Sequence, residues 1–275
     1  MYNNIILLFI VFFPIGIPAQ TINYKTEKAI FYYDTKEANF SDYQKERCLL
    51  DVYYPETIKK APVIVWFHGG GLTSGTREIP EELKNNGYLI VGVGYRLSPK
   101  VRAEQCIVDA VAALAWVFKN IEKFNGDSNA IFVSGHSAGG YLALMSVLDK
   151  NRLKKFNIDA NNVAGLVPFS GHTITHFTIR EEQGIPGEQP IIDTHAPLYF
   201  VRGDAPSTLL ITGDRELEML GRYEENAYFY RMMKVSGQKE ISLIELQGYD
   251  HNMTKPAFPL LLNFISEKTI INVEQ

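Results

Sequence analysis

The run GHSAGG at residues 135–140 constrains this chain more than any other segment. A Gly-x-Ser-x-Gly pattern is common by chance, but here a β-rich run precedes it and a helical run, residues 141–148, follows it. In that setting Ser137 lies on a sharp strand-to-helix turn, where the flanking glycines relieve crowding and the hydroxyl is held at the top of a sheet. We therefore predict that Ser137 is a nucleophile rather than part of a structural turn.

A second glycine-rich segment, HGGG at residues 68–71, directly follows a strand candidate. Three adjacent glycines lose much backbone entropy when they become ordered, and a simple turn does not require them. A loop that directs unshielded amide groups at a substrate does. We expect the amides of Gly70 and Gly71 to form an oxyanion hole with that of Ala138, at the start of the helix after the serine. We expect His68 to brace this loop through its ring rather than act as a base.

Strand and helix candidates alternate along the chain. The strand candidates are short runs rich in β-branched and aromatic residues: 48–54, 63–67, 89–95, 130–134, 163–169, 208–212 and 241–246. Several are apolar throughout, which is typical of strands that are covered on both faces in a mainly parallel sheet. The clearest helix, residues 104–121, has apolar residues at the three- and four-residue spacing of one helical face. The alternation predicts an α/β fold with a doubly wound sheet.

The chain has no linker rich in Gly, Ser or Pro, and its 275 residues fit a single domain. Residues 170–205 form the irregular part, which is too long and too rich in Pro and Gly for a plain connection. Long insertions of this kind are often lids or binding loops. Its HTITH run at residues 172–176 lacks the glutamate that a zinc-binding helix places after the first histidine, so we expect a loop or lid and no metal. We predict one domain over residues 20–275 with a cap-like insertion at about 170–205.

The first residues have the pattern of an export signal. An unbroken apolar run at residues 5–13 is too short to cross a bilayer, which needs about 20 apolar residues, but it suits the centre of a secretory signal. Proline and glycine then break any helix, and Ala19 offers a small residue for cleavage. We predict a signal peptide over residues 1–19 and an exported protein, periplasmic or secreted, with no stable membrane span after processing. An uncleaved anchor or a buried N-terminal strand is the alternative.

The formal net charge of −4 argues against a broad basic surface, so we expect no nucleic-acid partner. The two cysteines, Cys48 and Cys106, are too few for a multi-disulfide scaffold or a four-cysteine zinc site. In an oxidising compartment they form a disulfide only if their Cα separation allows it. A disulfide and two separate buried thiols therefore both stay open.

The order HGGG at 68–71, YRLSP at 95–99 and GHSAGG at 135–140 resembles the α/β-hydrolase superfamily. The chain most resembles the hormone-sensitive-lipase-like and BD-FAE-type esterases and the related arylformamidases. The likeness covers roughly residues 49–264, nearly all of the predicted mature chain. It implies the α/β-hydrolase fold, a Ser–acid–His triad and no cofactor.

In this fold the triad residues follow the order Ser, acid, His, so the base lies late, on a loop after the last strand. His251, in the run QGYDHN, follows the strand candidate at 241–246 and resembles the family's G-x-x-H loop. The other histidines belong to the two motifs or to the insertion before the acid: His68, His136, His172, His176 and His195. We predict that His251 is the general base.

The acid is harder to choose, because a strand candidate runs into the sequence GDRELE. The family places its carboxylate three residues after the strand-end glycine or alanine, which is Glu216 here. Asp214 is the commoner residue type but leaves the strand too early, and Glu218 is a third candidate. A glutamate orients an imidazole as well as an aspartate does. We predict Glu216 as the acid that acts with Ser137 and His251, and Asp214 and Glu218 stay open.

These residues predict a secreted serine esterase, a carboxylesterase-like hydrolase that cleaves small or medium acyl esters through an acyl-enzyme. Export and family analogy suggest a small-molecule ester or an acylated carbohydrate, such as acetyl or feruloyl groups on plant polysaccharide. An amide hydrolase, either an arylformamidase or a peptidase, would use the same residues. A non-catalytic binding protein on a hydrolase scaffold is the third interpretation, and the complete motifs argue against it. The oligomeric state is left unknown.

Overall fold

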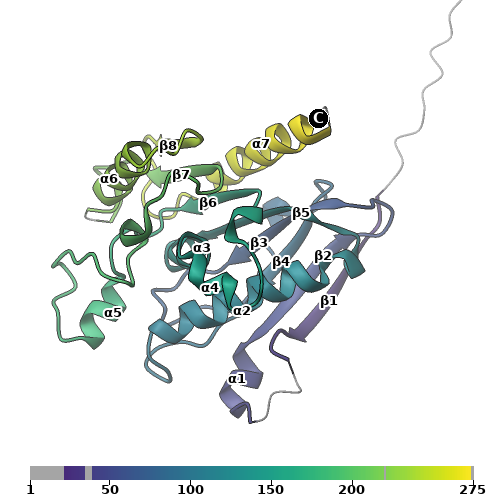
Figure 1. Ribbon diagram of the computed structural model, residues 1–275, viewed down its shortest axis with the longest axis horizontal. Coiled ribbons are helices and arrows are strands. Elements are labelled where there is room, and N and C mark those ends of the chain that lie inside the picture. The colour runs from purple at the N-terminus through teal and green to yellow at the C-terminus, as the bar shows by residue number, and fades with distance from the viewer. Residues whose placement is uncertain (1–21, 35–38, 220, 274–275) are drawn as a thin grey trace, which may run out of the picture.

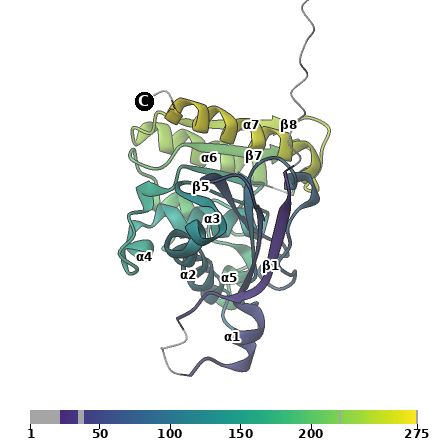
Figure 2. The ribbon, with the colours of Figure 1, turned by 90° about the vertical axis from the view of Figure 1, so that its right-hand side faces the viewer.

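The computed structural model describes residues 22–34, 39–219 and 221–273, so the predicted signal peptide lies outside the described residues. Its centre is one eight-stranded sheet with the order β1-β2-β4-β3-β5-β6-β7-β8 (Figure 1). The strands are β1 (Tyr24–Phe31), β2 (Leu49–Pro55), β3 (Ala61–Phe67), β4 (Leu89–Val93), β5 (Gly126–His136), β6 (Gly165–Phe169), β7 (Thr208–Gly213) and β8 (Ile241–Leu246). Strand β2 pairs antiparallel with both β1 and β4, and the other pairings are parallel. Strand β1 forms one edge of the sheet and faces the viewer in Figure 2.

Helices follow most of the parallel strands. The α-helices are α1 (Asp42–Arg47), α2 (Glu104–Asn120), α3 (Ala138–Leu148), α4 (Lys150–Lys154), α5 (Phe177–Glu182), α6 (Arg222–Val235) and α7 (Thr254–Val273). Short 3₁₀ turns are η1 (Glu81–Leu83), η2 (Ile121–Phe124), η3 (Ala160–Asn162) and η4 (Pro197–Phe200). None of the helices within the described residues combines the length and the apolar character needed to cross a membrane.

The core has two parts, one on each face of the sheet. Strand β3 shows why, because successive side chains of a strand point to opposite faces. Its residues Val63, Val65 and Phe67 pack with α2, α3 and α6 in one cluster. Ile64 and Trp66 pack with α7 in the other. The apolar runs of the sequence are thus buried on both sides, and the prediction of a mainly parallel, doubly wound α/β-hydrolase sheet is confirmed.

Residues 170–205 connect β6 to β7 and contain α5 and η4 (Figure 1). Two hydrogen-bonded anchors fix α5 to the rest of the molecule. The Thr178 hydroxyl donates to the carbonyl oxygen of Gly71 at 2.6 Å. The Glu182 carboxylate accepts from the Ser98 hydroxyl at 2.6 Å and from the Ala103 amide at 2.9 Å. The insertion is therefore docked on the HGGG loop and on the start of α2.

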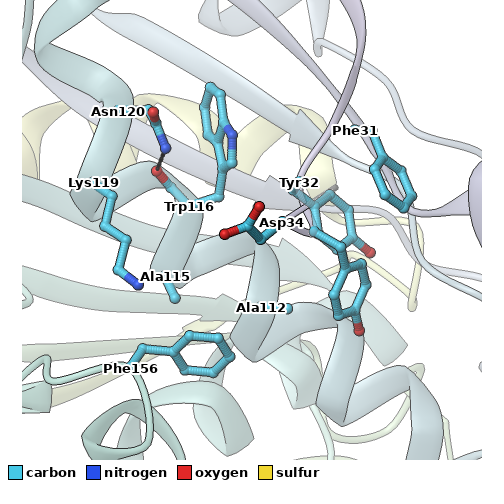
Figure 3. A pocket seen from close by; sticks show the side chains of 10 residues that line it. Phe31, Tyr32, Asp34, Ala112, Ala115, Trp116, Lys119, Asn120 and Phe156 are labelled. Carbon is cyan, nitrogen blue, oxygen red and sulfur yellow. Dashed lines mark hydrogen bonds between the residues drawn. The ribbon is translucent and has the colours of Figure 1, made fainter. Parts of the chain in front are cut away.

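Two features lie apart from the sequence motifs. Cys48 and Cys106 are buried free thiols, so the structure shows no disulfide between them. A hollow of about 470 Å³ lies between the end of β1 and α2, with Trp116 and Phe156 among the side chains in its walls (Figure 3). The described residues that line this hollow include none from HGGG, GHSAGG or the QGYDHN loop.

Candidate active site

Ser137 occupies the turn between β5 and α3 with φ 56° and ψ −117°, a conformation that side-chain-bearing residues rarely adopt. The chain can make this turn only because its neighbours are small. A Cβ atom at Gly139 would lie 2.0 Å from the carbonyl oxygen of Phe67, and one at Gly135 would lie 2.6 Å from the same oxygen. The glycines of the motif therefore have a steric reason, and the serine is lifted out of the strand as the sequence predicts.

His251 meets this serine from a distant part of the chain. Its Nε2 lies 2.9 Å from the Oγ of Ser137, so the imidazole is in place to accept the hydroxyl proton. His251 follows β8 on the loop that leads into α7. The structure thus brings together the nucleophile and the base that the sequence predicts.

The residue before the serine positions this loop. His136 Nε2 lies 2.8 Å from the carbonyl oxygen of His251, and a carbonyl only accepts, so His136 carries its proton on Nε2. Burial and the nearby His251 lower the pKa of His136 to about 4, so the ring is neutral. The middle residue of the serine motif therefore tethers the histidine loop, a role that the sequence did not indicate.

The acid that faces His251 is Glu218, and this corrects the prediction of Glu216. Glu218 Oε1 lies 2.5 Å from His251 Nδ1, whereas the Glu216 side chain is exposed. Asp214, the second candidate, accepts hydrogen bonds from the amides of Glu216 at 3.0 Å and Gly248 at 2.8 Å. The amide of Glu218 donates to the carbonyl oxygen of Asp214, so a full turn after β7 returns residue 218, rather than 216, to the sheet.

Glu218 is held by a dense set of donors. Its Oε2 accepts from the Ser170 hydroxyl at 2.5 Å and the Gly213 amide at 3.1 Å, and its Oε1 accepts from the Met219 amide at 2.9 Å. Burial alone would raise the pKa of Glu218, but the hydrogen bonds from His251, Ser170 and Met219 outweigh it and lower the pKa to about 2. The carboxylate stays ionised, as a partner for an imidazolium must.

A buried ionic group lies behind Ser170. Arg222, only 1% exposed, donates to the carbonyl oxygen of Ser170, to Glu225 Oε1 at 2.8 Å and to His172 Nε2 at 2.7 Å. Because a guanidinium only donates, His172 accepts on Nε2 and carries its proton on Nδ1, which lies 2.8 Å from Glu225. Burial and the charge of Arg222 lower the pKa of His172 to about 4. The first histidine of HTITH therefore belongs to a structural network.

The second histidine of HTITH also has a structural partner. His176 Nδ1 accepts the amide of Thr178 at 3.2 Å and so caps the start of α5. Within the described residues, no group of three or more His, Cys, Asp or Glu side chains forms a metal-binding arrangement. The two histidines of HTITH therefore help to hold the insertion in place through these contacts.

The HGGG loop reaches the nucleophile in a backbone conformation that glycine adopts readily. Gly70 and Gly71 have φ values of 109° and 62°, which L side chains rarely adopt. A Cβ atom built on Gly69 would lie 3.6 Å from the Cβ of Ser137, so the loop lies directly beside the serine. Ala138 is the first residue of α3, and its amide therefore has no partner within the helix. The loop and the start of α3 thus lie next to the serine, and the oxyanion hole of Gly70, Gly71 and Ala138 stays a prediction.

His68 supports this loop from beneath. Its ring stacks on Tyr95 with centroids 4.2 Å apart, and the Tyr95 hydroxyl donates to the carbonyl oxygen of His68 at 2.7 Å. Its Nδ1 donates to the carbonyl oxygen of Gly69, at 2.7 Å. Burial lowers the pKa of His68 to about 4. These contacts agree with a bracing side chain.

Comparisons with known proteins show the family to which this chain belongs. The sequence profile named BD-FAE matches residues 50–219. The chain belongs to the BD-FAE family. This BD-FAE chain is 28% identical over 236 residues to esterase LipC of Mycobacterium tuberculosis, covering 74% of this chain and 56% of LipC. It is 27% identical over 239 residues to the probable carboxylic ester hydrolase LipM of the same organism, covering 78% of this chain and 53% of LipM. It thus spans about half the length of these curated relatives.

Solved structures share the fold of this BD-FAE protein. A truncated carbohydrate esterase from gut microbiota superposes with a TM-score of 0.73 at 18% identity, covering 92% of this chain and 99% of the other. Esterase Est2 of Thermogutta terrifontis, with propionate bound, superposes with a TM-score of 0.67 at 20% identity, covering 90% of this chain and 94% of Est2. At such identities the likeness shows the α/β-hydrolase fold.

Proposed function

We propose that this BD-FAE family member is a serine hydrolase that cleaves carboxylic esters through an acyl-enzyme. The observation that carries the proposal is the chain of contacts from Ser137 to His251 at 2.9 Å and from His251 to Glu218 at 2.5 Å, beside the HGGG loop. The relatives LipC and LipM, both described as esterases, support the same reaction class.

The first half of the reaction forms the acyl-enzyme. His251 Nε2 takes the proton of the Ser137 hydroxyl while Oγ attacks the ester carbonyl carbon. Glu218, kept ionised by its donors, stabilises the imidazolium and keeps the proton on Nδ1. His251 then passes the Ser137 proton to the leaving alcohol, and the C–O bond of the ester breaks. In the second half, water loses a proton to His251 as its oxygen attacks the acyl carbon. The bond from that carbon to Oγ then breaks, the carboxylic acid leaves, and His251 returns the proton to Ser137.

The oxyanion that forms in both halves needs fixed donors. The amides of Gly70, Gly71 and Ala138 supply them in this proposal. Removing one such donor typically costs about 3–4 kcal/mol of transition-state stabilisation. The positive φ values of Gly70 and Gly71, which a residue with a side chain rarely adopts, support a loop that is shaped for this purpose.

We also propose that the protein is exported by its N-terminal signal and acts on small or medium acyl esters, including acylated carbohydrate. The apolar run at residues 5–13 supports export. The structural likeness to a carbohydrate esterase agrees with an acylated sugar as substrate, although it shows only the shared fold. N-terminal sequencing of the secreted protein tests cleavage after Ala19.

The decisive experiment compares wild type with Ser137→Ala on p-nitrophenyl acetate and butyrate. We expect turnover by wild type and none above background by the variant, with unchanged circular dichroism and thermal unfolding. A fluorophosphonate probe should label wild type alone, and failure of both assays would identify a non-catalytic scaffold. N-formylkynurenine serves as the amide substrate: faster hydrolysis of it than of the esters would reassign the enzyme as an amide hydrolase.

A further inference from the structure

A pocket of about 650 Å³ lies between the insertion and the start of α6. Phe177, one of its walls, also packs on the HGGG loop, because a Cβ atom at Gly71 would lie 3.2 Å from its ring. Met219, which follows Glu218 in the chain, lines the opposite side. The described lining includes neither Ser137 nor His251, but these two contacts place the pocket next to the HGGG loop and the loop that carries Glu218.

One residue of this pocket, Arg180, has an unusual environment. It is only 3% exposed. Within the described part of the chain, it donates a hydrogen bond to the carbonyl oxygen of Gln189, while its buried Nε has no partner and no ion pair forms. Burial lowers the pKa of Arg180, although the charges of Glu225 and of two other lining carboxylates raise it. A buried cation without a counter-ion is costly, so the free protein holds this guanidinium ready for a partner that it does not itself supply.

The carboxylates around Arg180 are used elsewhere or exposed. Glu225, the buried one, accepts from Arg222 on Oε1 and from the amides of Thr173 and Ile174 on Oε2. Three exposed carboxylates lie at the mouth of the pocket: Glu181, Glu188 and Glu224. Solvent screens the charges of exposed groups.

The buried charges around the pocket do not balance. Arg180 and Arg222 are positive, Glu225 is negative, and the lowered pKa of His172 keeps its ring neutral at pH 7. Among the buried side chains of the lining, the positive charges therefore outnumber the negative charges by one, because the other lining carboxylates, Glu181, Glu188 and Glu224, are exposed. The remaining lining is largely apolar, with side chains such as Ile174, Ile192 and Tyr228.

We propose that Arg180 binds a carboxylate of the substrate, so that the protein prefers esters that carry a second, free carboxylate. The inference rests on the proposed esterase function and specifies its substrate class. Arg180 lies one turn of α5 beyond Phe177, about 5 Å along the helix axis, and Phe177 packs on Gly71 of the HGGG loop. Either the acyl part, as in a half-ester of a dicarboxylic acid, or an acidic alcohol such as a uronic acid carries this group.

The test uses two pairs of esters that differ in one carboxylate. The acyl arm compares p-nitrophenyl hemiglutarate with p-nitrophenyl valerate, and the alcohol arm compares 3-carboxyphenyl acetate with phenyl acetate. For each pair, the ratio of kcat/KM is measured for wild type, Arg180→Gln and Arg180→Lys, with the exposed Arg102→Gln as the matched control. Ratios between variants cancel the intrinsic reactivity of each ester.

We expect Arg180→Gln to lower the acidic-to-neutral ratio in one arm by roughly 10- to 100-fold, as is typical of a lost hydrogen bond to a charged group. The kcat/KM for neutral esters should fall much less than that for acidic esters, Arg180→Lys should retain part of the preference, and Arg102→Gln should match wild type. The arm that responds tells whether the acid or the alcohol carries the carboxylate.

Other outcomes overturn the inference. Equal losses on acidic and neutral esters in Arg180→Gln would assign Arg180 to bracing the loop around Gln189. If that variant does not fold, the test is inhibition of wild type by glutarate and by glutaramide. Competitive inhibition by glutarate but not by glutaramide supports a carboxylate site, and no inhibition by glutarate overturns the proposal. If wild type hydrolyses the neutral esters but Arg180→Gln leaves the acidic-to-neutral ratio unchanged in both arms, the inference fails and the proposed esterase function stands. If wild type hydrolyses no ester at all, the proposed function itself fails.

Discussion

Glu218 and His251 lie 33 positions apart in the sequence, yet Oε1 of one is 2.5 Å from Nδ1 of the other. They meet because β7 and β8 are neighbouring parallel strands whose register pairs Gly213 with Leu246. The loops that leave both strands therefore start side by side, and the turn after β7 decides which carboxylate reaches the imidazole.

The acid can be tested by three matched substitutions. We expect Glu218→Gln to lower kcat by roughly 10³- to 10⁴-fold, because an amide cannot stabilise the imidazolium or fix its tautomer. Glu216→Gln and Asp214→Asn should keep near-normal kcat, since neither side chain contacts His251 in the structure. The comparison uses steady-state kinetics on p-nitrophenyl acetate. A larger loss of kcat in Glu216→Gln than in Glu218→Gln would show that Glu216 is the acid, as the sequence predicted.

Ser170 should matter for turnover although it does not touch the substrate in the proposed mechanism. Ser170→Ala removes the 2.5 Å hydrogen bond to Glu218 Oε2, so the pKa of Glu218 rises and its hold on His251 loosens. We expect kcat to fall about tenfold with little change in KM. Ser146→Ala is the matched control, because that buried hydroxyl donates to the carbonyl oxygen of Ala143, within α3 and away from Glu218. Equal kinetics for the two variants would contradict a positioning role.

Thr178 offers a test of the HGGG loop. Thr178→Val keeps the shape of the side chain but removes the 2.6 Å hydrogen bond to the carbonyl oxygen of Gly71. We expect a loss of about tenfold in kcat, because the loop that presents the oxyanion donors is less well fixed. Thr178→Ser keeps the hydroxyl and should restore most of the activity. If the valine and serine variants behave alike, the hydrogen bond does not position the loop.

The buried histidines predict a loss of stability in mild acid. Burial is the main cause that lowers the pKa of His68, His136 and His172 to about 4, whereas the unfolded chain has histidine pKa values near 6.5. Between these values the unfolded state binds more protons, so the free energy of unfolding falls as the pH drops from about 6.5 to 4. Each histidine contributes up to about 1.4 kcal/mol per pH unit.

Urea unfolding at about pH 7.5, 6 and 5 measures this slope. Buried His176, whose pKa is lowered even further, adds a fourth such group, so replacing one of them, as in His136→Asn, should reduce the slope by about a quarter. Glu218 and Glu225, whose pKa values are lowered to about 2, add a further loss only below about pH 4.5. A free energy of unfolding that is the same at the highest and lowest pH would be incompatible with these buried neutral histidines.

The parts of the site that were predictable from sequence are those whose causes are local. Ser137 could be recognised because its strained turn requires glycines within two residues of it. His251 followed from chain order, since it comes after the last strand and a glycine. The choice of Glu218 over Glu216 depends instead on how the turn after β7 closes and on its register with β8, which no short run of residues encodes.

The missed features depend on contacts between distant segments. Ser170 and Arg222 support the acid from β6 and α6, and neither stands in a motif. Strand β1 was missed because its YKTEKAIF sequence has several exposed polar residues and lies at an edge of the sheet. The long helix α7, with Pro259 inside it, was also not predicted. Local patterns thus located the reacting groups, while their supports needed the three-dimensional structure.

The two anchors of α5, through Thr178 to Gly71 and through Glu182 to Ser98 and Ala103, bear on how this protein can be engineered. A chimera that receives residues 170–205 from a relative gains a helix that evolved to bond to that relative's glycine loop and α2. The hydrogen-bond partners that it meets in this protein differ from those. Such a graft has to carry the matching residues of the glycine loop and of the start of α2 along with it. Otherwise the new selectivity arrives together with a poorly fixed glycine loop and slower turnover.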